Sequence, residues 1–405
     1  MTRLAPVLCF LLIAYASAGS IKNVVQKADH PGRVPSEYLV TVRRDDQTQQ
    51  IMQRINQGVN GITIKKIHNF NKISVLVIHS EDEARVANMA SVPGVLSVEA
   101  DVNEYVLACV DQDLTGISGL WNLARTNVRD ANGPEAFSYT EGDGAGTTVY
   151  VLDTGIYIEH SDFGGRAVHS YSVPPYDEES EFDMHGHGTH CAGTVMGATY
   201  GAAKSANAIG VKVVSRFGTG TVAQCIDGLE WTLNDFNSKN AGGQFKAVVS
   251  MSLGYSRSSA MDDVIQDISD AGLLTIAAAA NARTDACTYS PSGAAASISV
   301  AASDSNDALA SFTNYGSCVD IIAPGVNVLS AYIGGEDNTA TLSGTSMATP
   351  LVAGVVCRYL SQVDDTPAPE AIRQYLAQIS TKGVIDLNGF NTTPNNFLYQ
   401  PCDLP

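Results

Sequence analysis

The chain has 405 residues, of which 44% are hydrophobic and 16% are charged. With 36 glycines, this composition excludes a disordered or fibrous protein and predicts a large, turn-rich folded chain. The formal net charge is −18, and the acidic excess lies entirely after residue 108, which argues against nucleic acid and anionic membranes as partners.

The first eighteen residues have the pattern of an export signal. Arg3 gives a basic start, Leu4 to Tyr15 is an apolar run, and Ala16-Ser-Ala18 is a small-residue cleavage pattern. The apolar run is shorter than the about 20 residues that a membrane-spanning helix needs. We therefore predict a signal peptide over residues 1–18 and a secreted protein, extracellular or vacuolar, in a compartment where disulfides persist.

The next part of the chain reads as a small separate domain over residues 37–107, preceded by a short stretch at 19–36. Strand-like alternation occurs at residues 37–42, 62–64, 73–78 and 95–100, and helix-like patterns occur at 47–57 and 81–89. These elements predict an α+β unit of the ferredoxin-like kind. Residues 108–120 are expected to form a linker behind it.

From residue 121 to residue 405 the pattern changes to strands alternating with helices. Apolar strand-like runs occur at 147–152, 247–252, 273–279 and 298–302, and helical patterns occur at 222–234, at 260–271, and after His187 and Ser346. Near-continuous apolar strands separated by helices predict a doubly wound, mostly parallel α/β sheet with helices on both faces. Reactive groups in such sheets gather at the carboxyl ends of the strands, where Asp153 lies.

Three motifs in this region carry an Asp, a His and a Ser. They are Val149-Tyr-Val-Leu-Asp153-Thr-Gly155, His187-Gly-Thr-His-Cys-Ala-Gly193 and Gly344-Thr-Ser346-Met-Ala-Thr-Pro350. A serine hydroxyl becomes a nucleophile only when a nearby base takes its proton, and an imidazole with a pKa near 6.5 is suited to that task. A carboxylate can hold the imidazole in the required tautomer. Gly344 is expected to let the turn before Ser346 tighten.

Together these motifs, in this order, resemble the subtilisin-like serine proteases, and most closely their proteinase K branch. The resemblance covers about residues 37–400. It implies that Asp153, His187 and Ser346 form a catalytic triad in a secreted serine endopeptidase of broad specificity, with no cofactor for catalysis. It also implies that residues 37–107 are an inhibitory propeptide that the enzyme removes itself near Ala108.

The resemblance further implies which groups stabilise the transition state. Ala278-Ala-Ala280-Asn281 lies where the family has an Ala-Ala-Gly-Asn segment, so the side-chain amide of Asn281 and the backbone N–H of Ser346 are expected to form the oxyanion hole. Ala280 replaces the usual glycine beside the S1 pocket, and Leu351 replaces a histidine that commonly follows Pro350. We hypothesise that the extra methyl group of Ala280 disfavours large aromatic P1 residues, and it shifts the backbone of Asn281 if the position needs φ > 0.

Two segments match the family's binding strands for an extended peptide. Ser252, Leu253 and Gly254 match one of them, and Arg216-Phe-Gly-Thr-Gly220 lies near the other. The expected partners are protein or peptide substrates and the chain's own propeptide, with no nucleic acid or membrane, and the enzyme is expected to be a monomer.

The cysteines only partly follow the family. Of eight cysteines, Cys9 leaves with the signal peptide, so seven remain and at least one is unpaired. Cys287 and Cys318 resemble a disulfide found in proteinase K relatives. Cys191 lies one turn after His187, where that branch often has a free thiol. The pairing of the others is open: Cys109, Cys225, Cys357 and Cys402.

Calcium and sugar sites are also suggested. Asp320 matches a family position that binds structural Ca²⁺ together with backbone carbonyls, here those of Ala295 and Ser297. Asn391-Thr-Thr393 is an acceptor sequence for N-glycosylation.

Two alternatives compete with the protease interpretation. His185, His187 and His190, with Asp183, could bind zinc in a metalloenzyme, although the Ser346 motif would then have no explanation. Alternatively, the chain is a binding protein on a protease fold, silenced by Ala280 or by a retained propeptide.

Overall fold

The structure, a computed structural model, describes residues 33–43, 62–69, 73–102, 109–114, 120–130, 136–176 and 183–402. The chain divides into two compact units, Met1–Val106 and Leu107–Pro405, which we describe separately. The predicted signal peptide, the predicted helix over 47–57 and the predicted cleavage point near Ala108 lie outside the described residues.

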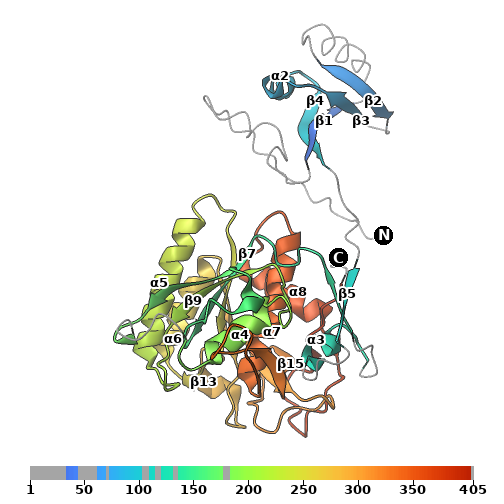
Figure 1. Cartoon of the computed structure of the whole chain (residues 1–405). Coiled ribbons are helices and arrows are strands. Elements are labelled where there is room, and N and C mark those ends of the chain that lie inside the picture. The colour runs from blue at the N-terminus through green and yellow to red at the C-terminus, as the bar shows by residue number, and fades with distance from the viewer. Residues whose placement is uncertain are drawn as a thin grey trace. The chain divides into compact units, whose positions relative to one another are not determined.

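The smaller unit is a four-stranded antiparallel sheet. Its elements are β1 (Arg33–Arg43), β2 (Thr63–Asn69), β3 (Ile73–His79), α2 (Glu83–Met89) and β4 (Val95–Val102), and the strand order is β2-β3-β1-β4 (Figure 1). In β3 every second residue is buried, so Leu76 and Ile78 meet Val40 and Val42 of β1 in an apolar core. This strand order agrees with the predicted ferredoxin-like unit, although β1 begins four residues before the predicted domain.

The larger unit contains a nine-stranded sheet with the order β18-β19-β15-β14-β12-β10-β7-β9-β8. All its neighbouring strands run parallel except β18 and β19. In chain order the strands are β7 (Thr147–Asp153), β8 (Ala167–Ser172), β9 (Asn207–Lys212), β10 (Lys246–Met251), β12 (Leu274–Ala278), β14 (Ser297–Ser303), β15 (Ile321–Pro324), β18 (Thr381–Lys382) and β19 (Asn396–Phe397).

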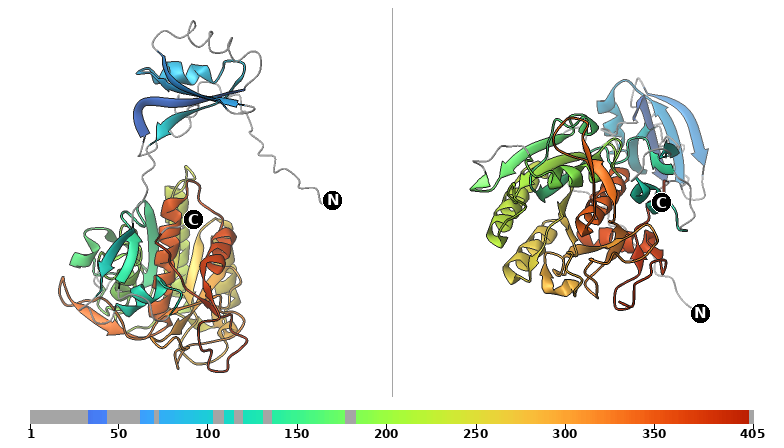
Figure 2. Two further views of the ribbon diagram at one scale, coloured as in Figure 1. Left: turned by 90° about the vertical axis from the view of Figure 1, so that its right-hand side faces the viewer. Right: turned by 60° about the horizontal axis from the view of Figure 1, so that its bottom comes forward.

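Helices cover both faces of this sheet because successive side chains of its apolar strands point to opposite sides. In β7, Val149 and Val151 join one buried cluster, whereas Tyr150 and Leu152 join another. The first cluster includes residues of α3 (Trp121–Thr126), α4 (His187–Met196), α7 (Thr345–Gln362) and α8 (Pro369–Ile379), and the second includes residues of α5 (Val222–Lys239) and α6 (Ser259–Asp270) (Figures 1 and 2). The predicted doubly wound α/β class is confirmed.

Three short antiparallel pairs complete the unit: β5 (Cys109–Asp113) with β6 (Ala136–Thr140), β11 (Tyr255–Ser256) with β13 (Tyr289–Ser290), and β16 (Val328–Ala331) with β17 (Thr339–Leu342). Two 3₁₀ helices, η2 (Ser161–Phe163) and η4 (Ala286–Thr288), lie in loops.

The segment predicted as a linker is partly structured. Residues 109–113 form β5, and a disulfide joins Cys109 to Cys402 near the other end of the larger unit. The predicted pair Cys287–Cys318 is also present, while Cys191, Cys225 and Cys357 are free and buried. β5 therefore belongs to the larger unit, because both its strand partner β6 and its disulfide partner lie there.

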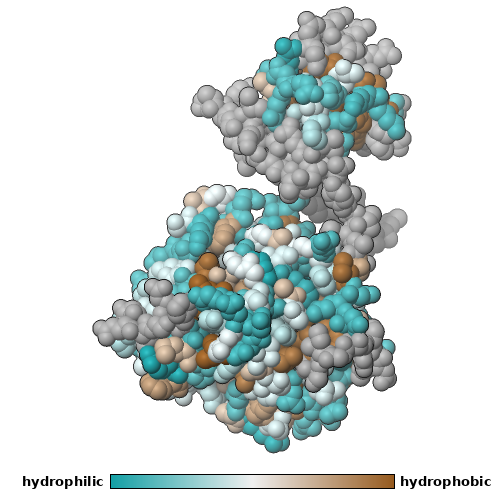
Figure 3. Space-filling model, in the orientation of Figure 1, coloured by the Kyte–Doolittle hydropathy of each residue, from teal (hydrophilic) through white to brown (hydrophobic). Residues whose placement is uncertain are grey.

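Among the described residues, no helix is long and apolar enough to cross a bilayer. On the face shown in Figure 3, apolar residues of the larger unit are scattered among polar ones.

Candidate active site

The carboxylate and the imidazole of the predicted triad are in direct contact. Asp153 is the last residue of β7 and is 2% exposed. Both its oxygens lie near Nδ1 of His187, at 2.7 Å for Oδ1 and 2.9 Å for Oδ2, and Oδ1 also accepts a hydrogen bond from the backbone N–H of Thr154 at 2.7 Å. Since Nδ1–H donates to the carboxylate, Nε2 of His187 is free to act as a base.

The start of α4, which carries His187, is organised by a buried carboxylate. Asp183 accepts hydrogen bonds from the backbone N–H groups of His185, Gly186 and Thr189, at 2.8–2.9 Å. The hydroxyls of Thr154 and Thr189 donate to it as well, at 2.8 and 2.7 Å. These bonds satisfy helix N–H groups that have no partner within the helix, and they tie α4 to the end of β7.

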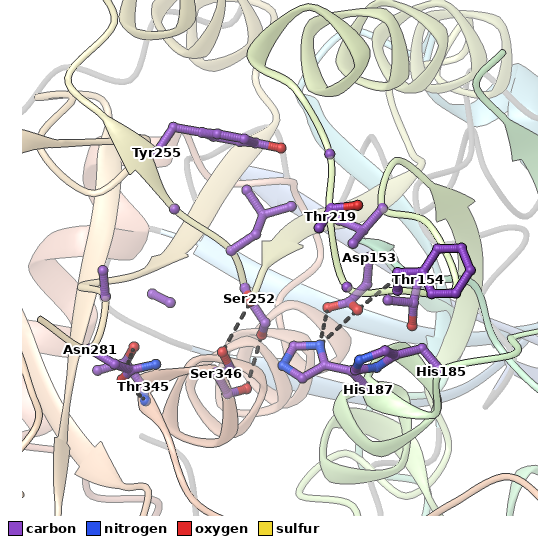
Figure 4. Close-up of a pocket in the computed structure, with 18 residues that line it drawn as sticks. Asp153, Thr154, His185, His187, Thr219, Ser252, Tyr255, Asn281, Thr345 and Ser346 are labelled. Carbon is purple, nitrogen blue, oxygen red and sulfur yellow. Dashed lines mark hydrogen bonds and ion pairs between the residues drawn. The ribbon is translucent and has the colours of Figure 1, made fainter. Parts of the chain in front are cut away.

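The third group, Ser346, is the second residue of α7. Its hydroxyl donates to the backbone oxygen of Ser252 at 3.0 Å, and the hydroxyl of Ser252 donates to the backbone oxygen of Ser346 at 3.0 Å. In Figure 4, Asp153, His187 and Ser346 follow one another across the pocket. Oγ of Ser346 is therefore bonded to Ser252 in this structure, and catalytic hydrogen bonds often form fully only when substrate is bound.

The glycine before Ser346 has a different role from the predicted one. Gly344 has φ 162°, an extended backbone that any residue adopts, so the turn does not need glycine for its conformation. A Cβ atom at this position would instead lie 3.4 Å from Nδ2 of Asn281. Glycine keeps the space in front of that amide open.

The amide of Asn281 is oriented by the residue before the serine. Its Oδ1 accepts hydrogen bonds from the backbone N–H of Thr345 at 2.9 Å and from the Thr345 hydroxyl at 3.0 Å. Nδ2 is thereby left as a donor, and Figure 4 shows Asn281 on the side of Ser346 away from His187. An amide donor beside the serine is the type of group that an oxyanion hole uses.

These groups line one pocket of about 670 Å³. Its walls include Ser252, Leu253, Gly254 and Ala280, the residues predicted to contact substrate, and also residues 217–220 of the second predicted segment. Phe217 is 81% exposed at its rim. The two segments follow different strands of the sheet, β10 and β9, and both line this pocket.

Ala280 adopts a backbone conformation that is rare for an L-amino acid. Its φ is 77°, and its Cβ lies 3.4 Å from the position that a Cβ on Gly254 would occupy. The condition stated for this position, φ > 0, is therefore met, at a cost of about 1–2 kcal/mol for a non-glycine residue. Leu351, which stands where the family commonly has a histidine, is by contrast fully buried in α7 and belongs to the core.

The electrostatics favour a protonated imidazole at rest. Burial lowers the pKa of His187, but the Asp153 carboxylate and Cys191 outweigh it and hold the pKa well above 6.5. The thiol of Cys191 lies 3.9 Å from Nδ1, and burial raises its own pKa. The neighbouring His190 behaves in the opposite way, since burial lowers its pKa to about 4.

The predicted zinc cluster does not form. Nε2 of His190 lies 3.1 Å from the backbone oxygen of Val328 and 3.2 Å from that of Ala340, while Asp183 accepts the hydrogen bonds described above. Among the described residues, the group of potential ligands that does come together is Asp153, His187 and Cys191, two of which belong to the triad.

The predicted calcium ligands lie together but are not free. The carboxylate of Asp320 pairs with Nη1 of Arg373, whose Nη2 donates to the backbone oxygens of Ala295 at 2.9 Å and Ser297 at 2.7 Å. The structure therefore offers no open cation site at these three residues.

Several residues of the site were not identified as functional from the sequence. Thr345 orients Asn281, Thr154 joins Asp153 to Asp183, and Asp183 organises α4. A signal existed for Thr154 and Thr345, since each directly follows or precedes a triad residue in its motif. Asp183 was considered only as a zinc ligand, and its role at the start of α4 gave no signal because its helix partners are backbone atoms. Arg373, outside this pocket, gave none because its partners are distant in sequence.

Comparison with known proteins finds relatives that cover most of this chain. The model of the subtilase family matches residues 144–396. The chain is 36% identical over 387 residues to an alkaline proteinase of Hapsidospora chrysogena, covering 90% of this chain and 92% of that protein. It is 33% identical to a cuticle-degrading serine protease of Arthrobotrys oligospora, covering 96% of both. A crystal structure of a cold-adapted subtilisin-like serine proteinase matches with a TM-score of 0.63 and 36% identity, covering 70% of this chain and 98% of the other.

Proposed function

Since the chain belongs to the subtilase family of serine peptidases, we propose that it is an endopeptidase that cleaves proteins through Ser346, His187 and Asp153. The observation that carries this proposal is the contact of both Asp153 carboxylate oxygens with Nδ1 of His187. This contact lies at the edge of the pocket that Ser346 and Asn281 also line. It leaves a base, a hydroxyl and an amide donor around one open space, which is what acyl transfer to serine requires.

Each residue has a defined task in the proposed reaction. Nε2 of neutral His187 takes the proton of Ser346 as Oγ attacks the scissile carbonyl, and Asp153 stabilises the imidazolium that forms. The amide of Asn281 and the N–H of Ser346 donate to the oxyanion. His187 then protonates the leaving amine. A water molecule next gives its proton to His187, attacks the acyl group on Ser346, and releases it as the second product.

Substrate recognition through the main chain supports broad specificity. A peptide strand lying between residues 252–254 and 217–220 would bind by backbone hydrogen bonds, which are the same for every sequence. Side-chain selection then falls mainly on the wall that includes Ala280.

The smaller unit is proposed to be the propeptide of this enzyme. It precedes the part of the chain that the family model matches, it folds around its own core, and the relatives that cover nine-tenths of this chain include it in their length. Removal between Val102 and Cys109 would leave β5 and the Cys109–Cys402 disulfide in the mature enzyme. With the export pattern at the N-terminus, we propose a secreted enzyme.

The test compares the secreted chain with its Ser346→Ala variant by intact mass and N-terminal sequence, and by hydrolysis of a denatured protein. We expect the parent to lose about the first hundred residues and to be active, and the variant to do neither. Ser343→Ala, an exposed serine three residues earlier, is the matched control and should behave as the parent. An active Ser346→Ala variant would contradict the proposal.

A further inference from the structure

Three oxygens near the amino ends of β14 and β15 surround one positively charged side chain. They are a carboxylate oxygen of Asp320 and the backbone oxygens of Ala295 and Ser297, and the charge is the guanidinium of Arg373. We call these four residues the Arg373 cluster. The same three oxygens are the ones that the resemblance assigned to calcium.

The cluster is built by elements that are held independently of it. Arg373 lies in the second turn of α8, whose residues Ile372 and Leu376 are buried and whose Tyr375 stacks on Tyr359 with ring centroids 3.8 Å apart. Asp320 is fixed by the backbone N–H of Ser299, which donates to its Oδ2 at 2.8 Å. The charge and the oxygens therefore meet because the surrounding fold places them there.

We propose that the guanidinium of Arg373 is the cation that the oxygens of Asp320, Ala295 and Ser297 bind, and that it excludes a divalent cation from them. Calcium takes six to eight oxygen ligands at about 2.3–2.6 Å. Here the lone pairs of both carbonyls are directed at Nη2, 2.7 and 2.9 Å away, and one oxygen of Asp320 is paired with Nη1. A calcium ion within reach of these oxygens would contact the guanidinium, and two cations would share one carboxylate.

The planar guanidinium suits this task because it presents several N–H donors in a fixed arrangement. Nη1 donates to the carboxylate of Asp320, Nη2 donates to two backbone carbonyls, and Nε lies 3.4 Å from a carboxylate oxygen of Glu370. A lysine would present one compact charge instead of this fixed fork of donors. The cation is part of the chain, so this cross-link between α8 and the sheet is independent of the calcium concentration.

The cluster supports the connection that carries Asn281. That connection runs from the end of β12 to the start of β14, and Arg373 binds the oxygens of Ala295 and Ser297 at its far end. Loss of the charge is therefore expected to loosen the loop without removing any group from the pocket.

The surroundings also predict what replaces the guanidinium when it is removed. Cavities of about 350 Å³ and 220 Å³ both have Arg373 in their walls, the first with Ala295 and Glu370 and the second with Asp320. Truncation of the side chain joins them and admits water to the three oxygens. Together with water, these oxygens are a ligand set that calcium accepts.

The experiment measures the shift in Tm between chelator and millimolar calcium for full-chain variants. All carry Ser346→Ala, so autolysis does not affect the result, and the outcome does not depend on the proposed catalytic function. Intrinsic tryptophan fluorescence reports the larger unit, since both tryptophans, Trp121 and Trp231, lie there. Added Asp320→Asn tests whether a shift arises at this cluster.

We expect Asp320→Asn to leave the calcium shift of the parent unchanged. Arg373→Ala is expected to lower the Tm by about 5 °C in chelator. Calcium should restore most of this loss, and adding Asp320→Asn to the variant should abolish the restoration. Arg257→Ala is the matched control, because Arg257 also pairs with a carboxylate and donates to a backbone oxygen, that of Cys287 at 2.8 Å. It should lose stability without gaining a calcium response.

Three results would overturn the proposal. The first is a parent calcium shift that Asp320→Asn removes, and the second is an Arg373→Ala variant whose calcium shift equals that of the parent. If Arg373→Ala does not fold in chelator, folding that calcium restores supports the proposal. Failure of both Arg373→Ala and Arg373→Gln to fold in calcium overturns it.

Discussion

Two aspartates of the larger unit each hold a nitrogen cation, with opposite consequences. Asp153 binds the imidazole of His187, whose other nitrogen faces the pocket. Asp320 binds the guanidinium of Arg373, whose second terminal nitrogen donates hydrogen bonds to two backbone oxygens. The first pair can lose its proton as the pH rises, and the second cannot, because a guanidinium stays charged in proteins. The same carboxylate chemistry therefore supports turnover in one place and a fixed cross-link in the other.

One loop joins the pocket to the Arg373 cluster. The connection from β12 to β14 has Ala280 and Asn281 at its pocket end and the oxygens bound by Arg373 at its other end. If this division is right, changes at the pocket end alter rate constants and changes at the Arg373 end alter the Tm.

The largest difference is expected from the two matched substitutions of aspartate. Asp153→Asn should lower kcat by about 10⁴-fold, because the amide no longer holds His187 in the required tautomer or stabilises its charged form. Asp320→Asn should leave kcat within about twofold and lower the Tm, because it leaves Arg373 without its counter-charge. Steady-state kinetics and thermal unfolding of both variants test this. Equal losses of kcat would remove the distinction.

The next effect is expected at Asn281. Asn281→Ala should lower kcat by about 100- to 1,000-fold with little change in KM, because its amide acts on the oxyanion and not on the ground-state peptide. Its Tm should change less than that of Arg373→Ala, although the two positions lie at the ends of one loop. A rise in KM with unchanged kcat would show that Asn281 binds substrate instead.

The pH dependence separates the two pairs in a different way. Because the pKa of His187 is raised, kcat/KM should rise about tenfold per pH unit up to a value above 6.5 and then level off. The protonated Asp153–His187 pair stabilises the fold fully below the ordinary pKa near 6.5, and this contribution is lost as pH rises through the raised pKa. Activity and this part of the stability should therefore change in opposite directions.

The stability part is measured as the Tm of Ser346→Ala against pH, with Ser346→Ala/His187→Ala as control. The slope above neutral pH should be smaller in the control, while the contribution of the Arg373 cluster stays constant. An acid limb of kcat/KM centred below 6.5 would contradict the assigned pKa direction.

The smallest effect is expected at Ala280. Ala280→Gly should raise the ratio of kcat/KM for phenylalanine over alanine at P1 by about tenfold, since one methyl group leaves the pocket wall. It should also raise the Tm by about 2 °C, because glycine adopts φ 77° without the penalty of a Cβ atom. Ala282→Gly, two residues on in the same loop, is the control and should lower the Tm. A parent that already prefers phenylalanine strongly at P1 would contradict the hypothesis.

Much of the fold could be predicted because its strands are continuous apolar runs. The run predicted at 147–152 is β7 (Thr147–Asp153), and that predicted at 222–234 is the start of α5, which begins with a capping box between Thr221 and Gln224. The short strand β15 and the strand β9 were not predicted. β9 contains the fully buried Lys212, whose charge obscures an otherwise apolar pattern.

Those residues of the candidate site that lie in distinctive local motifs were predicted from the sequence. Asp153, His187, Ser346 and Asn281 each have distinctive neighbours, and the structure brings all four around one pocket. The organisation of α4 by Asp183 depends on hydrogen bonds from backbone N–H groups, which leave no residue pattern.

The sequence by itself determined the alternation of strands and helices, the order of the three catalytic motifs and the presence of Asp320. Only the tertiary structure decided that Cys109 pairs with Cys402, 293 residues away, and that Arg373, 53 residues after Asp320, takes the place expected for calcium. The physical reason is that a motif records which groups are near in sequence, whereas a cation site depends on every group that the folded chain brings to the same oxygens.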